Sequence, residues 1–296
     1  MKKTKIHLFL SILIVSYPVF RFSTLAQPLN SNCYQLKSSL NAYSFHTPLS
    51  EGEMDLFDLI DYCAEQKFDA VDITGYYFPG YPDIPSDEYI YAVKNHAFKR
   101  GVEISGTGIR TDFTIPDSRK RKENIELVNK WTDVAAKLGA PVLRIFAGHE
   151  VPPEYSNKEI MKWMIPDIKE CVNIGKEKGI IIGMQNHNGF IKNADRIIEI
   201  CRIIDSDWFG IVLDIGSYRQ GDPYDQITRS IPYAVNWQLK EKMYENGKEV
   251  NTDIKKVIDI IRENCYTGYI PIETLGPGDP QKKVRIMKKR LDFVLN

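Results

Sequence analysis

The sequence predicts an α/β fold with a single domain, a closed (β/α)8 barrel of the TIM type. Eight short apolar runs follow one another along the chain, and each is followed by a polar loop and usually by a helical pattern. These units cover about 255 residues, the usual size of one such barrel. No linker rich in Pro, Gly and Ser divides the chain, and no GxGxxG follows the first run, which argues against a doubly wound open sheet.

The predicted strands are short and mostly apolar, as expected for strands that are buried on both faces of a parallel barrel. Helices between them are indicated by apolar residues at helical spacing, for example Ile197, Ile198, Cys201 and Ile204. In chain order the predicted strands are Leu40–Phe45, Ala70–Gly75, Val102–Gly106, Val142–Phe146, Ile180–Gln185, Gly210–Asp214, Ala234–Leu239 and Tyr269–Glu273.

Several residues indicate where the predicted helices begin and end. Ser50 with Glu53 and Ser156 with Glu159 match the capping-box pattern of a helix start. Asp279 precedes a proline, as an N-cap residue often does. Glycines also follow helical patterns, at the position where a left-handed residue commonly ends a helix. They are Gly101, Gly139 and Gly179.

The first 26 residues match a secretory signal peptide, which leaves residues 27–296 as the barrel domain. Three lysines precede an apolar run over residues 8–20, and Thr24-Leu25-Ala26 is suited to cleavage before Gln27. The run is too short to span a bilayer comfortably, although a membrane anchor is the alternative. We therefore expect an exported protein, periplasmic or extracellular, without stable membrane insertion after signal cleavage.

Composition restricts the partners of the chain. Lys plus Arg and Asp plus Glu number 39 each, so the chain lacks the basic excess that binding to nucleic acid requires. The five cysteines are widely spaced and include no CxxC pair, so we expect no disulfide framework and interpret them as small core residues. No pattern specifies an oligomeric state.

Polar residues gather at the carboxyl ends of the predicted strands, the end that carries the chemistry in TIM barrels. A polar side chain in a buried strand costs free energy unless it is partnered or functional. Alternation puts Asn236, Gln238 and Lys240 on one face of their strand, and Gln185 and His187 likewise share a face. We therefore predict one pocket that brings together Asp72, Arg144, Gln185, His187, Asp214, Gln238, Lys240 and Glu273.

Single members of this set also have structural interpretations. Asp214 could cap the loop that follows its strand, and Arg144 could only neutralise buried carboxylates. His187 could be a hydrogen-bonded core histidine, and Lys240 could be solvated at its strand end. The joint pattern carries more weight than any one residue.

Motifs in this order resemble those of the xylose isomerase-like TIM barrels, the sugar phosphate isomerase/epimerase-like proteins. The resemblance covers nearly all of the mature chain and is specific for the superfamily, but not for a substrate. The matching motifs are Ser39–Phe45, Gly139–Phe146, Gln185–His187, Val212–Gly216, Gln238–Lys240 and Gly268–Glu273.

The resemblance implies a divalent cation that a Glu, an Asp, a His and a second Glu hold from the last four strands. Asp214 and Glu273 match the Asp and the second Glu, whereas Gln185 replaces the first Glu and Gln238 replaces the His. Two carboxylates with two amides suit Mg²⁺, Mn²⁺ or Ca²⁺ better than Zn²⁺. Because an amide is a weak neutral ligand and no base, a metal-free site is the alternative.

We expect an isomerase or epimerase that transfers a proton next to the carbonyl of a small, non-phosphorylated carbohydrate. A Glu would act as acid and base, and the cationic groups would stabilise the developing oxyanion. The expected catalytic residues are Glu273, Asp214, Lys240 and His187, and the expected substrate-binding residues are Asp72, Arg144, Gln185 and Gln238.

Other functions stay open at this point. Loss of the Glu and His ligands favours a non-catalytic carbohydrate-binding barrel with a degenerate metal site. A glycoside lyase or hydrolase could use Asp214 and Glu273 as a carboxylate pair. An apurinic endonuclease, which shares this barrel, is disfavoured by the neutral charge, the expected export and the lack of a multi-His zinc set.

Overall fold

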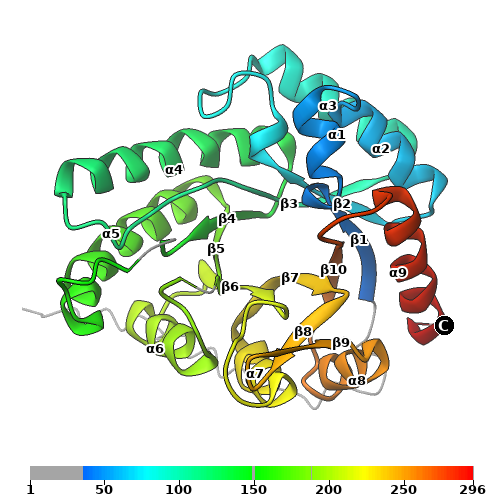
Figure 1. Cartoon of the computed structure of the whole chain (residues 1–296). Helices are drawn as coiled ribbons and strands as arrows, with labels where there is room; N and C mark the ends of the chain where they lie inside the picture. Colours follow the sequence, from blue (N-terminus) through cyan, green and yellow to red (C-terminus); the bar gives the residue numbers. More distant parts are fainter. Residues whose placement is uncertain (1–35, 149–150, 188, 296) are drawn as a thin grey trace, which may run out of the picture. The chain divides into compact units, whose positions relative to one another are not determined.

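The strands close into a barrel in which all neighbouring strands are parallel (Figure 1). The computed structural model describes residues 36–148, 151–187 and 189–295. Within these ranges the barrel has eight strands in the order β1-β10-β7-β6-β5-β4-β3-β2, so the predicted (β/α)8 barrel is confirmed. Its strands are β1 (Leu36–Asn41), β2 (Ala70–Thr74), β3 (Glu103–Gly108), β4 (Val142–Phe146), β5 (Ile181–Gln185), β6 (Phe209–Asp214), β7 (Ala234–Lys240) and β10 (Gly268–Glu273).

The prediction of the first strand was wrong in its position. β1 covers Leu36–Asn41 rather than Leu40–Phe45, and Ala42–Phe45 form the short 3-10 helix η1. The side chain of Asn41 accepts a hydrogen bond from the backbone N–H of Tyr43 at 2.9 Å, which turns the chain at the end of the strand. The other predicted strands lie within one or two residues of their observed ends.

The first half of β1 is rich in polar residues, which explains why the search for apolar runs did not find its true start. Ser38 and Ser39 are buried, and each is hydrogen-bonded rather than exposed. The backbone N–H of Ser38 donates to Asp69 Oδ2 at 2.7 Å, and the hydroxyls of Ser39 and Ser105 are 2.8 Å apart. These pairs satisfy polar groups that would otherwise make burial costly.

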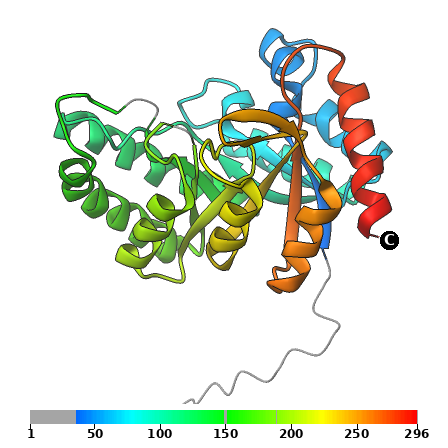
Figure 2. The ribbon, with the colours of Figure 1, turned by 60° about the horizontal axis from the view of Figure 1, so that its bottom comes forward.

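Helices lie on the outside of the barrel, where their apolar faces pack against the strands (Figure 1 and Figure 2). In the part of the chain that the structure describes, none of them has the length and apolarity of a membrane-crossing helix. They are α1 (His46–Glu51), α2 (Leu56–Glu65), α3 (Asp87–Arg100), α4 (Ser118–Leu138), α5 (Asn157–Lys178), α6 (Ala194–Ile204), α7 (Pro223–Ser230), α8 (Ile254–Glu263) and α9 (Pro280–Leu295), with the short 3-10 helices η2 (Gly75–Tyr77) and η3 (Ile231–Tyr233).

Most of the predicted helix ends are confirmed. Ser156 and Glu159 form the expected capping box at the start of α5, and Asp279 accepts the backbone N–H of Gln281 at the start of α9, at 2.9 Å. The predicted glycines follow helices with positive φ. They are Gly101, Gly139 and Gly179.

The capping box predicted at Ser50 is wrong. Ser50 lies inside α1, and the helix that follows begins after Asp55, whose side chain accepts the backbone N–H of Phe57 and of Asp58. The Asp58 carboxylate accepts the backbone N–H of Asp55 in return, at 3.1 Å. The box therefore exists five residues further along and is built from two aspartates.

The predicted signal peptide, residues 1–26, and Cys33 lie outside the described residues. The core prediction holds for Cys63, Cys171 and Cys201, which are buried, and it is wrong for Cys265, which is exposed. Cys265 lies beyond the end of α8, at Glu263, and has a φ of +53°, so it is not part of the buried face of that helix.

A hairpin that the sequence analysis did not predict follows β7 directly. β8 (Lys242–Glu245) and β9 (Lys248–Asn251) pair antiparallel. The turn residues Asn246 and Gly247 both have positive φ, +48° and +80°, as a two-residue hairpin turn requires. The guanidinium of Arg219 lies 3.4 Å from the centre of the Tyr244 ring, so the hairpin packs against the loop after β6.

Candidate active site

The carboxyl ends of the barrel strands surround a cavity of about 640 Å³. Of the predicted site residues, all except Asp72 line it. Every strand contributes a lining residue from its own end or from the loop that follows. In barrel order from β1 these include Asn41, Glu273, Lys240, Asp214, Gln185, Arg144, Arg110 and Thr74.

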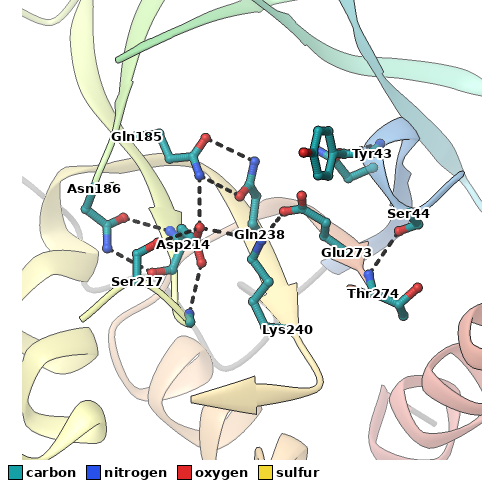
Figure 3. Close-up of polar contacts among 12 residues, drawn as sticks. Tyr43, Ser44, Gln185, Asn186, Asp214, Ser217, Gln238, Lys240, Glu273 and Thr274 are labelled. Carbon is teal, nitrogen blue, oxygen red and sulfur yellow. Dashed lines mark hydrogen bonds and ion pairs between the residues drawn. The ribbon is translucent and has the colours of Figure 1, made fainter. Parts of the chain in front are cut away.

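An ammonium group shared by two carboxylates forms the centre of the site (Figure 3). Lys240 Nζ donates a hydrogen bond to Glu273 Oε2 and lies 3.5 Å from Asp214 Oδ2. The three residues are only 7%, 5% and 3% exposed for Lys240, Glu273 and Asp214. The strand register explains the meeting, because Glu273 pairs with Lys240 across β10 and β7.

Asp214 is held rigidly by its surroundings. Oδ2 accepts hydrogen bonds from Gln185 Nε2 at 2.9 Å and Ser217 Oγ at 2.8 Å, and Oδ1 accepts the backbone N–H of Gly216 at 2.9 Å. The amide of Asn186 bonds both the backbone N–H and the backbone oxygen of Asp214, at 2.7 and 2.8 Å. Asp214 therefore both caps the loop after its strand and pairs with Lys240.

The amide of Gln238 can serve either protonation state of Glu273. In one orientation its Oε1 accepts from Gln185 Nε2 at 2.8 Å and faces Glu273. In the other, its nitrogen donates to Glu273 Oε2 at 2.7 Å and to Asp214 Oδ2 at 3.2 Å, but it also faces Gln185 Nε2 at 2.8 Å in place of the hydrogen bond of the first orientation. A carboxylic acid donates to an oxygen and a carboxylate accepts from an N–H, so the first orientation suits protonated Glu273 and the second suits ionised Glu273.

Burial shifts the acid–base properties of the centre. It raises the pKa of Glu273 above the usual glutamate value, an effect that the charge of Lys240 opposes and that of Asp214 reinforces. Burial on its own lowers the pKa of Lys240, but Asp214 and Glu273 outweigh it, so this pKa lies above the usual lysine value. Lys240 is therefore an ammonium ion, and Glu273 keeps a proton to higher pH than an exposed glutamate.

Arg144 reaches the cavity from β4 between two aromatic rings. Nη1 donates to the Tyr76 hydroxyl and to the backbone oxygen of Ile109, each at 2.8 Å. The guanidinium carbon lies 4.3 Å from the centre of the Phe146 ring. A β-carbon on Gly108 would lie 2.6 Å from Arg144 Nε, so the buried guanidinium needs glycine at that position.

Asp72 lies apart from the cavity, on the inner face of the barrel. Its Oδ2 accepts a hydrogen bond from Asn236 Nδ2 at 2.9 Å. Burial raises the pKa of Asp72 to about 6, although Arg144 opposes the rise. This position favours an electrostatic and structural role for Asp72 over direct contact with a ligand.

His187 lines the cavity after β5, and its ring meets the Phe146 ring edge to face with centroids 5.2 Å apart. Sequence reasoning missed other lining residues, among them Tyr43, Tyr76, Arg110, Ser217 and Arg219. Each lies within a few residues of the end of a strand, in a loop or a short 3-10 helix, so counting a few positions beyond each strand end could have found them.

The residues around Lys240 do not fit a divalent cation. A cation between Asp214 and Glu273 would lie beside the Lys240 ammonium, and at an effective dielectric of about 20 and a distance of about 4 Å the repulsion would be about 8 kcal/mol. Gln185 turns its Nε2, a donor, toward Asp214. Within the described ranges, no three His, Cys, Asp or Glu side chains are grouped as metal ligands.

Comparison with known proteins places the chain in a family. The model of the xylose isomerase-like TIM barrel family matches residues 60–294. The chain belongs to this family. An uncharacterized protein of Methanocaldococcus jannaschii is 26% identical over 193 residues, and the match covers 60% of the chain and 66% of that relative's length.

Solved structures of epimerases share the fold. A D-psicose 3-epimerase from Clostridium cellulolyticum, crystallised with D-tagatose, has a TM-score of 0.70 at 14% identity and covers 88% of this chain and 99% of its own. The 3-keto-D-glucoside 4-epimerase of E. coli has the same TM-score and coverage at 12% identity. At such low sequence identities, the likeness shows that this chain shares the fold of these epimerases, but it does not show their chemistry.

Proposed function

We propose that the chain is a sugar isomerase or epimerase that transfers a proton next to the carbonyl of a small, non-phosphorylated carbohydrate. The observation that carries the proposal is the buried Lys240–Glu273 pair at the cavity. A carboxyl group with a raised pKa beside an obligatory ammonium ion combines a base with an oxyanion partner.

In the proposed step, the Glu273 carboxylate takes a proton from the carbon next to the substrate carbonyl. The electrons of that C–H bond form a carbon–carbon double bond, and the carbonyl oxygen becomes an enolate oxygen. Lys240 stabilises this oxygen with a hydrogen bond from its ammonium group. Return of a proton to the opposite face of the same carbon gives the epimer. Return to the former carbonyl carbon gives the isomer, provided that the hydroxyl proton of the neighbouring enediol oxygen passes to the enolate oxygen.

The remaining residues of the centre support this step. Asp214 keeps Lys240 charged and in place, because it contributes to the raised pKa of the ammonium. A second base for the opposite face of the carbon is the other role that its position allows. Gln238 can turn either the oxygen or the nitrogen of its amide toward Glu273, so it can pair with the carboxylic acid or with the carboxylate.

We propose that the reaction runs without a metal ion. The resemblance gives a divalent cation to relatives that have a Glu and a His where this chain has Gln185 and Gln238. Lys240 supplies the positive charge here, at the oxygens that the cation would need. The proton transfer above therefore uses only groups of the chain.

Two observations support a carbohydrate substrate, and a third supports export of the protein. The cavity volume of about 640 Å³ suits a small molecule, and its lining is rich in hydrogen-bonding side chains. The structural relatives named above are sugar epimerases. We also propose that the chain is exported, from the pattern of residues 1–26, which N-terminal sequencing of the mature protein tests.

Deuterium exchange tests the proton transfer without knowledge of the product. The protein is incubated in D₂O with a panel of keto and aldo sugars that includes psicose, tagatose and a 3-keto-glucoside, and NMR follows deuterium at the carbon next to the carbonyl. We expect exchange with at least one sugar, and Glu273→Gln should slow it by about 10²-fold or more. The matched control is Glu263→Gln, an exposed glutamate on α8. Equal rates for wild type and Glu273→Gln would remove the assignment.

A non-catalytic carbohydrate-binding barrel is the second candidate. The observation in its favour is the pair of neutral amides, Gln185 and Gln238, at positions where relatives of the family carry a Glu and a His. Calorimetric binding of a sugar from the same panel, without deuterium exchange at any carbon, would support this candidate over the enzyme.

A further inference from the structure

Two guanidinium groups gather around one aromatic ring on the side of the cavity formed by β2, β3 and β4. The guanidinium carbon of Arg110 lies 4.4 Å from the centre of the Tyr76 ring, and that of Arg144 lies 5.4 Å from it. All three residues line the cavity. We refer to Arg110 and Arg144 as the arginine pair.

The arginine pair is not neutralised by the residues around it. In the described part of the chain, no carboxylate lies within 4.0 Å of either guanidinium, although other arginines such as Arg121 form such ion pairs. The charge of Arg144 acts on Asp72 and Glu273, but neither carboxylate lies within 4.0 Å of its guanidinium. Arg144 is buried, and a buried guanidinium is usually paired, so an anionic ligand in the cavity would supply a partner that the described residues do not.

Charge within the cavity is unbalanced in the same direction. The cationic lining groups are Arg110, Arg144, Arg219 and Lys240, and the carboxylates are Asp112, Asp214 and Glu273. With every group ionised, four cations against three carboxylates leave a net charge of +1 in the lining. Asp214 and Glu273 both lie at the Lys240 ammonium, so the positive excess lies on the arginines. The whole chain has a net charge of zero, so this excess is local.

Stacking prepares the pair to bind an anion. The rings of Tyr76 and Phe146 hold the guanidinium groups in place, and Arg144 uses only Nη1 for its bonds to Tyr76 and Ile109. The N–H groups that stay available form the planar fork that recognises carboxylate and phosphate oxygens. Because the side chains are already ordered, little conformational entropy is lost on binding.

We propose that the substrate carries an anionic group, a carboxylate or a phosphate ester, which the arginine pair binds. The inference deepens the proposed function and rests on it for the reacting end of the sugar. Barrel order supports the division of labour, because β4 lies opposite β10 and β3 lies opposite β7 in the closed ring of eight strands. The anion would bind across the opening from Glu273 and Lys240, so the sugar would span the cavity between them.

Calorimetry tests the proposal with three probes that differ in charge: glucose, glucuronate and a phosphate ester of glucose. At low salt we expect at least one anionic probe to bind about tenfold or more tightly than glucose, with the preference decreasing at high salt. Arg110 is exposed, so Arg110→Gln should fold normally and lose most of this preference while its affinity for glucose changes little. Arg119→Gln, with a side chain that is 83% exposed, is the matched control and should keep the preference.

The outcomes separate this inference from the proposed function. If no anionic probe binds more tightly than glucose, or if Arg110→Gln keeps the preference, the anion site is wrong, whatever the deuterium exchange shows. A preference for glucuronate identifies a sugar acid, whereas a preference for the phosphate ester confirms the anion site and contradicts the non-phosphorylated substrate. An anion preference without deuterium exchange on any probe leaves the anion site standing and removes the enzyme.

Discussion

The two sides of the cavity differ in whether their charged groups are paired within the chain. On the β6–β7–β10 side, the Lys240 ammonium lies beside the carboxylates of Asp214 and Glu273, and hydrogen bonds from neighbouring residues satisfy most of their remaining atoms. On the β2–β4 side, Arg110 and Arg144 stack on aromatic rings and keep N–H groups without a carboxylate among the described residues. The charged groups of the first side are paired with one another, which keeps Lys240 in its ammonium form. The second side needs a partner, which suits recognition.

Replacing Lys240, on the β6–β7–β10 side of the cavity, should have the largest effect on stability and activity. Lys240→Met leaves two buried carboxylates without their shared cation, so we expect a loss of about 3–5 kcal/mol in the free energy of unfolding, together with loss of deuterium exchange. Urea denaturation at neutral pH measures the stability. Lys122→Met, an exposed lysine on α4, is the control and should change stability by less than about 0.5 kcal/mol. A Lys240→Met protein as stable as the wild type would mean that the two sides do not differ as described.

The pH dependence of stability tests the buried carboxyl of Asp72, which lies apart from the cavity. The pKa of Asp72 is raised from 3.8 to about 6 in the folded state, so between these values the folded chain binds more protons than the unfolded chain. Stability contributed by this group therefore falls as pH rises through that window, by on the order of 2–3 kcal/mol. Asp72→Asn removes the ionisable group, and its stability relative to wild type should increase from about pH 4 to about pH 6.

Denaturant unfolding across this pH range measures the difference between Asp72→Asn and wild type. Asp83→Asn, at an exposed position, is the control and should follow the wild-type profile. A constant difference between Asp72→Asn and wild type over the whole range would show that Asp72 titrates normally.

A smaller effect is expected from the aromatic support of the arginine pair. Tyr76→Phe removes the hydroxyl that accepts a hydrogen bond from Arg144 and keeps the ring on which both guanidinium groups stack. We expect a loss of about 1 kcal/mol in stability and retention of the preference for anionic sugars. Tyr91→Phe, which alters a half-exposed ring on α3, should be neutral. Loss of the anion preference in Tyr76→Phe would show that the hydroxyl of Tyr76, and not its ring alone, positions the arginine pair for anion binding.

Chelation should have the smallest effect of all. Because Lys240 lies at the oxygens that a divalent cation would need, dialysis against EDTA should leave both deuterium exchange and the melting temperature unchanged. Elemental analysis before and after dialysis checks that metal was removed. Exchange that disappears on dialysis and returns with Mn²⁺ would contradict the metal-free proposal.

The sequence was most informative where burial is complete. β4 was predicted with its observed ends, because Val142–Phe146 is nearly all apolar and its one charged residue points to the site. β1 was misplaced because hydrogen bonds to Asp69 and Ser105 bury its serines, and such partners distant in sequence leave no local pattern. The β8–β9 hairpin did carry a local signal, the Asn246-Gly247 pair, which was overlooked.

The candidate site was predictable as a set, but not in its division of labour. The strand-end rule brought Asp214, Lys240 and Glu273 together, since parallel strands end at one edge of the barrel. It also included Asp72, whose strand register places it on the inner face beside Asn236 and away from the cavity. Which cation pairs with which carboxylate depends on distances across the barrel, and no spacing along the chain encodes them.

Gly108 has a consequence for redesign of this cavity. A single methyl group at position 108 would collide with Arg144 Nε, so positions 108 and 144 need to be substituted together. A variant with a smaller apolar side chain at position 144 would open a void, and an alanine at position 108 would fill part of it. Conversion of the cavity to neutral ligands therefore needs a paired substitution on adjacent strands, and either change by itself leaves a clash or a hole.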